Sequence, residues 1–328
     1  MTDKCMILSL KETAEYLRGV REAVILTHSS PDGDTLGSAF ALKMMLQKLG
    51  AKAEVICGDT VHEKFSYLGT VTQIENFDAN GKTVIAVDVA DIKLMGGIPA
   101  EIKENTELCI DHHISNKQYA KRLCLVSEAS ACCEILYELC ELLGIVPDKE
   151  LASALLTGII TDTGCFQFTN TTPKTHIVAA ELMQCGANSE FITKLFFETK
   201  SSGRLFLEKK VLENLEIYFD GKCALTTLDY DTIHSDESDE SELDGVAGIT
   251  RTVEGVLVGI TLKGKEEGKY KISVRTHSPV DASAICGRLG GGGHIRAAGC
   301  QVKGDAETAK KAILESVAKE LEALETEN

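Results

Sequence analysis

Short hydrophobic runs alternate with longer helical segments over roughly the first 190 residues of the chain. Each run is continuously apolar, which is typical of parallel strands that are covered on both faces. The segments between them carry apolar residues at helical spacing, and Gly50 ends the first of these helices. This alternation predicts an α/β fold with a mostly parallel, doubly wound sheet. The predicted strands are 23–27, 53–57, 83–87 and 108–110, and the predicted helices are 36–49, 129–143, 148–161 and 173–186.

The pattern changes after about residue 190 and predicts a second, smaller α/β domain. We expect an N-terminal domain at 1–188, a linker at 189–202 and a C-terminal domain at 203–328, with a cleft between the two domains. The elements predicted for the second domain are a helix at 204–218, strands at 223–228, 255–262 and 269–275, and a charged helix at 305–325.

Polar side chains follow the predicted elements of the first domain. His28 comes just after the first strand, Asp88 directly follows the strand at 83–87, and Asp162 closes the helix at 148–161. The triplet Asp111-His112-His113 follows the strand at 108–110. Ligands of open parallel sheets bind beyond the carboxyl ends of the strands, so we expect these residues to share one site.

These residue types, with their spacing, indicate a metal site. Asp34 lies two residues after Asp32, and His28 lies four before it, so on an extended loop the three side chains can point to one centre. Asp88, His112 and Asp162 add two carboxylates and an imidazole. Six oxygen and nitrogen ligands are too many for one structural zinc and suit two divalent ions that share a carboxylate.

Mixed carboxylate and imidazole ligands favour Mn²⁺, with Mg²⁺, Co²⁺ or Zn²⁺ as alternatives. Two such ions activate a bridging hydroxide and neutralise phosphoryl oxygens, which predicts attack of that hydroxide on phosphorus. The competing interpretation is structural. Asp32 also suits a Pro-Asp-Gly turn, and Asp88 and Asp162 also suit helix caps.

A glycine run in the second domain predicts a phosphate-binding segment. Consecutive glycines permit positive φ angles and close backbone approach, so their N–H groups can form an anion nest, although a flexible turn is the alternative. Arginine binds phosphate with two parallel hydrogen bonds. Asn116 follows the double histidine and either contacts phosphate or caps a turn. The candidate substrate-binding residues are Arg275, Gly291, Gly292, Gly293, His294, Arg296 and Asn116.

The charge balance limits the partners of the chain. Its 328 residues carry 34 Lys and Arg against 50 Asp and Glu, a formal net charge of -16. Long nucleic acids depend on many basic contacts to phosphate, so they are not expected partners, whereas bound metal ions make a small anionic substrate compatible with this charge. The 12 cysteines form no CxxC pair, and no run is long enough to be a membrane helix or a signal peptide. We expect a cytoplasmic protein with reduced thiols.

Five blocks of residues together resemble a known family. The blocks His28–Asp34 with Gly37-Ser38, Val87-Asp88, Asp111-His112-His113 and Gly158–Gly164 are similar to the motifs of the DHH phosphoesterase superfamily. The segment 287–299, Gly-Arg-Leu-Gly-Gly-Gly-Gly-His-Ile-Arg-Ala-Ala-Gly, resembles the DHHA1 substrate-binding domain. Length and domain order look most like the nanoRNase/pAp phosphatase branch.

The resemblance implies a role for each site residue. One ion would be held by His28, Asp32 and Asp88, and the other by Asp34, Asp88, His112 and Asp162. His113 would face the scissile phosphate, and Asp111 would orient the loop or a ligand imidazole. The glycine-His segment would hold the distal phosphate or nucleotide.

The implied activity is hydrolysis of very short oligonucleotides (nanoRNA) and pAp by a monomer or homodimer. One alternative is a phosphodiesterase acting on cyclic or linear dinucleotides such as c-di-AMP, pApA or pGpG. Another is a nucleotide sensor without catalysis.

Overall fold

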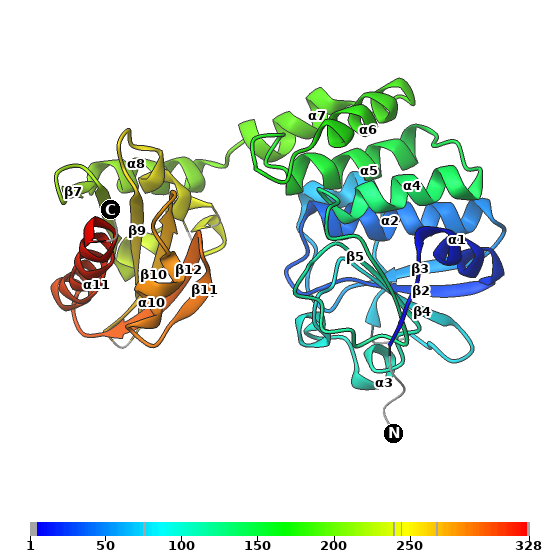
Figure 1. Ribbon diagram of the computed structural model, residues 1–328, viewed down its shortest axis with the longest axis horizontal. Coiled ribbons are helices and arrows are strands. Elements are labelled where there is room, and N and C mark those ends of the chain that lie inside the picture. Colours follow the sequence, from blue (N-terminus) through cyan, green and yellow to red (C-terminus); the bar gives the residue numbers. More distant parts are fainter. Residues whose placement is uncertain (1–4, 75–76, 239, 244, 267, 327–328) are drawn as a thin grey trace. The chain divides into compact units, whose positions relative to one another are not determined.

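The computed structural model describes residues 5–74, 77–238, 240–243, 245–266 and 268–326. The chain divides into two compact units, Met1–Thr199 and Lys200–Asn328 (Figure 1). The predicted linker at 189–202 contains helix α7 (Ser189–Thr193) and a π-helical turn, Lys194–Glu198. None of the helices in the described ranges is both long and apolar enough to cross a membrane.

The first unit is built on a six-stranded sheet in which every neighbouring pair is parallel. The strand order is β1-β6-β5-β4-β2-β3, which confirms the predicted parallel sheet. The hydrophobic runs did not predict the short edge strand β1 or its neighbour β6. The strands are β1 (Met6–Ile7), β2 (Glu22–Leu26), β3 (Lys52–Ile56), β4 (Thr83–Val87), β5 (Leu108–Asp111) and β6 (Arg122–Leu125).

Both faces of this sheet are buried, which explains the continuous apolar runs. Ile25 of β2 packs into the larger hydrophobic core, whereas its neighbours Val24 and Leu26 pack into the core of the opposite face. The larger core lies under long helices, and the other lies under short elements (Figure 1). The long helices are α1 (Leu10–Gly19), α2 (Gly33–Lys48), α4 (Cys132–Leu143), α5 (Lys149–Asp162) and α6 (Pro173–Gln184), and the short elements are η3 (Ile92–Met95) and α3 (Ala100–Lys103).

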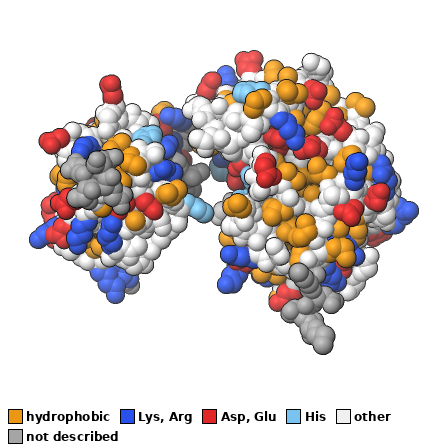
Figure 2. Space-filling model, in the orientation of Figure 1, with side chains coloured by type: hydrophobic (Ala, Val, Ile, Leu, Met, Phe, Trp, Pro, Cys, Tyr) orange, Lys and Arg blue, Asp and Glu red, His pale blue; other side chains and the backbone are white. Residues whose placement is uncertain are grey.

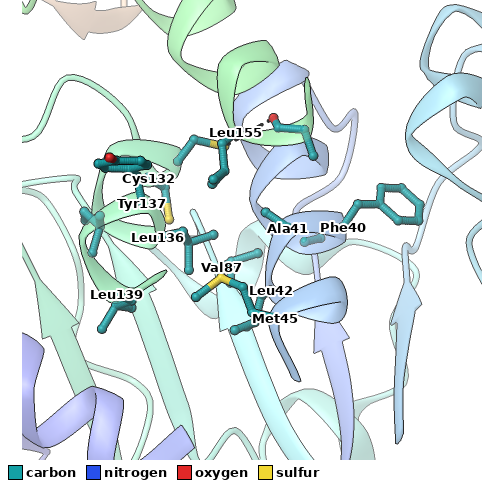
Figure 3. Close-up of a cluster of buried hydrophobic side chains, with 14 of the residues drawn as sticks. Phe40, Ala41, Leu42, Met45, Val87, Cys132, Leu136, Tyr137, Leu139 and Leu155 are labelled. Carbon is teal, nitrogen blue, oxygen red and sulfur yellow. Dashed lines mark hydrogen bonds between the residues drawn. The ribbon is translucent and has the colours of Figure 1, made fainter. Parts of the chain in front are cut away.

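Helix α2 occupies the centre of the larger core. Figure 3 shows Leu42 and Met45 of α2 beside Val87 of β4 and Leu136 of α4. Two glycines let α2 and α5 approach closely. A Cβ atom on Gly37 would lie 2.5 Å from the Ala154 carbonyl oxygen, and one on Gly158 would lie 2.3 Å from Cys133 Sγ.

The second unit is a mixed sheet with strand order β11-β12-β10-β9-β8-β7, in which only the β8–β9 pair is parallel among the described strands. Helix α11 (Ala306–Thr326) buries Ala309, Ile313 and Val317 at helical spacing against its core. The other elements are α8 (Ser202–Glu213), β7 (Glu216–Tyr218), β8 (Cys223–Leu228), α9 (Tyr230–Ile233), β9 (Val258–Lys265), β10 (Lys269–Thr276), α10 (Ala282–Gly287), β11 (Gly292–His294) and β12 (Ala297–Lys303).

The predicted helix at 204–218 is wrong at its C-terminal end. Helix α8 stops at Glu213, and β7 pairs with β8 in antiparallel fashion. The Asn214 side chain donates to the Thr227 carbonyl oxygen at 2.9 Å. These contacts with a strand further along the chain override the local helical pattern.

We expect Gly37→Ala to destabilise the first unit by about 1–3 kcal/mol, because the added methyl group meets rigid backbone rather than a flexible side chain. Urea unfolding followed by circular dichroism measures this. The matched control is Gly19→Ala in α1, where a Cβ atom meets nothing within 4 Å. An unfolding midpoint of Gly37→Ala equal to that of Gly19→Ala would show that the α2–α5 contact tolerates the methyl group.

Candidate metal centre

Candidate residues follow or end three neighbouring strands, β5, β4 and β2, whereas Asp32 and Asp34 lie at the start of α2 and Asp162 ends α5. His28 lies two residues beyond β2, Asp88 directly follows β4, and Asp111 ends β5. Strand β3 lies on one side of β2 and β4 on the other, so the chain reverses its winding at β2. Such a reversal opens a crevice at the strand ends, which is where ligands of these sheets bind.

Helix α2 begins earlier than the sequence pattern indicated, and this changes how two aspartates are placed. Asp32 is the N-cap, and its Oδ1 accepts hydrogen bonds from the backbone N–H groups of Asp34 and Thr35, each at 3.0 Å. Asp34 therefore lies in the first helical turn, and the expectation of one extended loop from His28 to Asp34 is wrong. A local cap outcompetes the extended conformation because it satisfies N–H groups that the helix leaves free.

Asp34 is held by a second helix. Its Oδ2 accepts from the Cys132 backbone N–H at 2.6 Å, and its Oδ1 accepts from that of Cys133 at 3.0 Å. These are the first residues of α4, whose own N-cap, Ala131, offers no side-chain acceptor. The positive end of the α4 dipole thus stabilises the buried Asp34 carboxylate.

The other five predicted ligand residues converge around Asp88. His28 Nε2 lies 3.8 Å from Asp88 Oδ2 and 4.0 Å from Asp32 Oδ1. His112 Nε2 lies 3.5 Å from Asp88 Oδ1, 3.9 Å from Asp34 Oδ2 and 3.8 Å from Asp162 Oδ2. Each oxygen of Asp88 therefore faces a different group of donors.

The hydrogen bonds of the two imidazoles prepare them to bind metal. His28 Nδ1 lies 2.7 Å from the Ser29 carbonyl oxygen, and His112 Nδ1 lies 3.1 Å from that of Ala129. A carbonyl oxygen only accepts, so each Nδ1 carries the proton and each neutral ring keeps its lone pair on Nε2. His112 Nε2 and Asp88 Oδ1 are buried without a hydrogen-bond partner among the described residues. Unpaired buried donor atoms of this kind fit a divalent ion.

Asp111 is a fully buried anchor for the loop that follows β5. Its Oδ1 accepts from the backbone N–H groups of His112 and His113 and from His113 Nδ1, at 2.8, 3.1 and 2.8 Å. Its Oδ2 accepts from Asn116 Nδ2 at 2.6 Å. The Asn116 amide also donates toward the Val89 carbonyl oxygen at 3.3 Å, so its donors are used inside the loop. These bonds favour a positioning role for Asn116 over the predicted substrate contact.

Three features of the centre had no distinct sequence signal. Asp88 has a positive φ of 57°, a conformation rare for non-glycine residues and frequent at functional sites. Thr35 Oγ1 donates to Asp88 Oδ2 at 2.6 Å. Asn170 Nδ2 donates to the Ser130 carbonyl oxygen at 2.8 Å and to Asp162 Oδ2 at 3.3 Å. Asp88 belongs to a predicted motif and Thr35 directly follows one, but residue type alone indicates neither the φ angle of Asp88 nor these hydrogen bonds.

Crowding of carboxylates changes their acidity. Burial, together with the charge of Asp34, raises the pKa of Asp88 well above its ordinary value and that of Asp162 to about 7. The hydrogen bond that His113 donates to Asp111 raises the pKa of His113. Burial alone would raise the pKa of Asp111, but hydrogen bonds from His113 and Asn116 outweigh it and lower that pKa. The buried carboxylates of the centre therefore repel one another when they are ionised, and a bound cation would reduce this repulsion.

The predicted substrate-binding residues of the second unit lie on and beside the β11–β12 hairpin and on β10. A Cβ atom on Gly291 would lie 2.2 Å from the Gly299 carbonyl oxygen, and one on Gly293 would lie 2.6 Å from the Ala297 carbonyl oxygen. The close packing of the strands therefore requires both glycines. Gly292 and the exposed His294 lie on β11. Arg296 Nη1 donates to the Val280 carbonyl oxygen at 2.6 Å, and the half-buried Arg275 donates to that of Val274 at 3.1 Å. The anion nest stays a prediction.

We expect the metal-free protein to lose stability as pH rises from about 5.5 to about 8, because folded Asp162 and Asp88 bind protons that the unfolded chain has released. The raised pKa of His113 acts in the same direction, since its stabilising charge is lost over this range. Thermal melts with a chelator measure the effect, and Asp162→Asn should flatten the profile. Mn²⁺ should raise the melting temperature more at the higher pH. A melting temperature that rises with pH in the chelated protein would contradict this.

Comparison with known proteins agrees with the motifs. Residues 22–159 match the model of the DHH family, N-terminal domain, and residues 221–323 match the DHHA1 domain. The bifunctional oligoribonuclease and PAP phosphatase NrnA of Thermus thermophilus is 34% identical over 320 residues, 95% of this chain and 94% of that protein. The protein of that name in Bacillus subtilis is 26% identical over 284 residues, 85% of this chain and 88% of that protein.

A solved structure, described as an exopolyphosphatase-related protein from Bacteroides fragilis, has a TM-score of 0.84. It is 22% identical and covers 94% of this chain and 95% of its own, which establishes a shared fold. The resemblance expected from the sequence motifs is therefore confirmed: the chain belongs to the DHH family and carries a C-terminal DHHA1 domain.

Proposed function

We propose that the protein is a metal-dependent phosphoesterase that hydrolyses very short oligonucleotides and pAp, using two divalent ions, with Mn²⁺ favoured. The observation that carries the proposal is the convergence of six donor residues around Asp88, with His112 Nε2 and Asp88 Oδ1 buried and unpaired within the described chain. The names of the two NrnA relatives support the choice of substrates.

Divalent ions held in this centre would lower the pKa of a water molecule and neutralise phosphoryl oxygens. Asp88 would join the two sets of donors, with His28 and Asp32 on one side and His112, Asp34 and Asp162 on the other. Helix caps and carbonyl hydrogen bonds within the protein orient these donors toward one another.

His113 is the proposed contact to the scissile phosphate. Asp111 accepts the Nδ1 proton of His113 at 2.8 Å, which fixes the ring and leaves Nε2 to meet the substrate. The raised pKa of His113 keeps the ring protonated at higher pH than a free imidazole. A protonated Nε2 donates a hydrogen bond to a phosphoryl oxygen or a proton to the leaving oxygen. Asp111 acts through His113 as a positioning residue.

The surface charge supports a short substrate. The net charge of -16 opposes contact with a long phosphate backbone. On the visible faces of both units, Lys and Arg side chains lie in separate small groups interspersed with acidic ones (Figure 2). Metal ions and a few basic residues can still attract one or two phosphates locally.

We expect Asp88→Asn to abolish tight Mn²⁺ binding and to lower phosphodiesterase activity by about a thousandfold or more, because both groups of donors lose their shared carboxylate. Calorimetry and hydrolysis of pApA and pAp measure the two effects. The metal-free variant should melt at or above the wild-type temperature, since a buried like-charge contact disappears, so lost activity would not reflect unfolding.

Asp148→Asn is the matched control. Asp148 caps the opposite end of α5 from Asp162, about 20 Å along the helix, and asparagine also caps helices. Wild-type activity in Asp88→Asn would contradict the proposal. A wild-type protein that binds nucleotides but turns over none of them with Mn²⁺ would instead be a sensor.

We expect turnover of 5′-phosphorylated RNA to be fastest for di- to pentanucleotides and slow for an RNA of roughly 20 nucleotides, because the acidic surface repels a longer backbone. A chain-length series under constant salt measures this. The same assay with c-di-AMP and pGpG tests the dinucleotide alternative. Faster turnover of the long RNA than of a dinucleotide would refute the size preference.

A further inference from the structure

A cavity of about 530 Å³ opens at the carboxyl end of β3, within the segment that connects β3 to β4. Its walls come from residues 57–74, and none of the six candidate metal ligands lines it. Its volume is in the range of small-molecule sites, roughly 300–1,000 Å³. The metal site described above therefore does not account for this cavity.

The walls of the cavity are held by contacts with the rest of the first unit. The 3₁₀ helix η1 (Glu63–Leu68) buries Phe65, whose ring centroid lies 5.2 Å from that of Phe196. Tyr67 Oη lies 2.7 Å from Thr157 Oγ1, within hydrogen-bond distance. The Thr72 N–H donates to the Val55 carbonyl oxygen at 2.7 Å. A cavity shaped in advance binds its ligand with a small ordering cost.

Hydrogen bonds tie one wall to the metal centre. Asp59 Oδ2 accepts from the Ser30 backbone N–H at 2.8 Å, and Cys57 Sγ donates toward the His28 carbonyl oxygen at 3.8 Å. Ser30 lies midway between the candidate ligands His28 and Asp32. Strands β2 and β3 are neighbours, and neighbouring strands are about 4.8 Å apart. The carboxyl end of β3 therefore lies about one strand spacing from that of β2, which precedes His28, and about two from that of β4, which precedes Asp88.

The chemistry of the lining selects the ligand. Asp59 and Glu63 contribute carboxylates, and Thr60, Ser66 and Gln73 contribute hydroxyl and amide groups. Neither Lys nor Arg occurs among the described residues that line the cavity. A phosphate would meet two carboxylates there, with the imidazole of His62 as the one side chain among these lining residues able to carry a positive charge. A nucleobase and its ribose instead offer N–H and O–H donors to the carboxylates and acceptors to the hydroxyl and amide groups.

We propose that this cavity is a nucleoside subsite, which holds the base and ribose next to the scissile phosphate of a short oligonucleotide. The inference rests on the proposed function, because the phosphate has to be held in the metal centre. It deepens that function by assigning recognition of the nucleoside to the β3–β4 segment, apart from the residues that carry out hydrolysis.

The test compares pApA with two analogues, each lacking one base. For the wild-type protein, removal of the base that occupies the cavity should lower kcat/KM about tenfold, a typical contribution of one well-buried contact. Gln73→Trp, which places a larger side chain at the wall of the cavity, should lower kcat/KM for pApA by a similar factor. The Gln73→Trp variant should cleave the analogue that lacks the cavity-bound base at the wild-type rate, because this analogue has no base to contact the cavity.

Gln47→Trp is the matched control, since Gln47 is an exposed glutamine near the C-terminal end of α2, away from Asp34. It should cleave all three substrates at wild-type rates. The chain has no Trp, so emission from each introduced indole checks folding. Equal wild-type rates on pApA and both analogues, or an equal loss on all three substrates in Gln73→Trp, would overturn the subsite.

Failure of the proposed function gives a different result, namely a wild-type protein that hydrolyses neither the dinucleotides nor pAp. Calorimetric titration with AMP then tests nucleoside binding in the cavity independently of hydrolysis. AMP that binds the wild-type protein and binds Gln73→Trp about tenfold more weakly supports the subsite. Equal affinity for the two proteins, or no binding to either, overturns it.

Discussion

Mutual repulsion among the carboxylates around Asp88 is the constraint on which the rest of the first unit depends. Burial and the charges of Asp34 and Asp32 raise the pKa of Asp88, and the same causes act on Asp162. Without compensation, such a cluster would favour protonation or opening of the fold. The structure supplies part of the compensation through helix dipoles and N–H donors, and leaves the remainder to cations.

The position of α2 provides that compensation. Asp32 caps α2 itself, and Asp34 accepts two N–H groups from the start of α4. This requires α2 to lie very close to α4 and α5, which Gly37 and Gly158 permit. The geometry of the metal centre therefore depends on the packing of these helices. A methyl group added between them would disturb both.

The fold separates chemistry from recognition along the sheet. The reacting phosphate is expected at the ends of β5, β4 and β2, where Asp111 holds His113 in place. The cavity beside β3 has neither Lys nor Arg among its described lining residues, and in our proposal it holds the uncharged part of a nucleotide. In our proposal, one parallel sheet offers neighbouring places for ions and for a nucleoside, because its strand ends all open in the same direction.

The amino-acid sequence by itself determined the α/β class, four of the six strands of the first sheet, the family and the residue types of the centre. Continuous apolar runs and polar residues at strand ends are local patterns, so they can be interpreted without knowing what packs against them. Only the tertiary structure decided how these residues are held. The capping of α4 by Asp34 joins residues that lie 98 positions apart, and the use of Asn116 by Asp111 depends on the path of a buried loop. The end of α8 and the pairing of β7 were likewise set by a strand further along the chain. Such contacts arise when the core closes, and no local pattern encodes them.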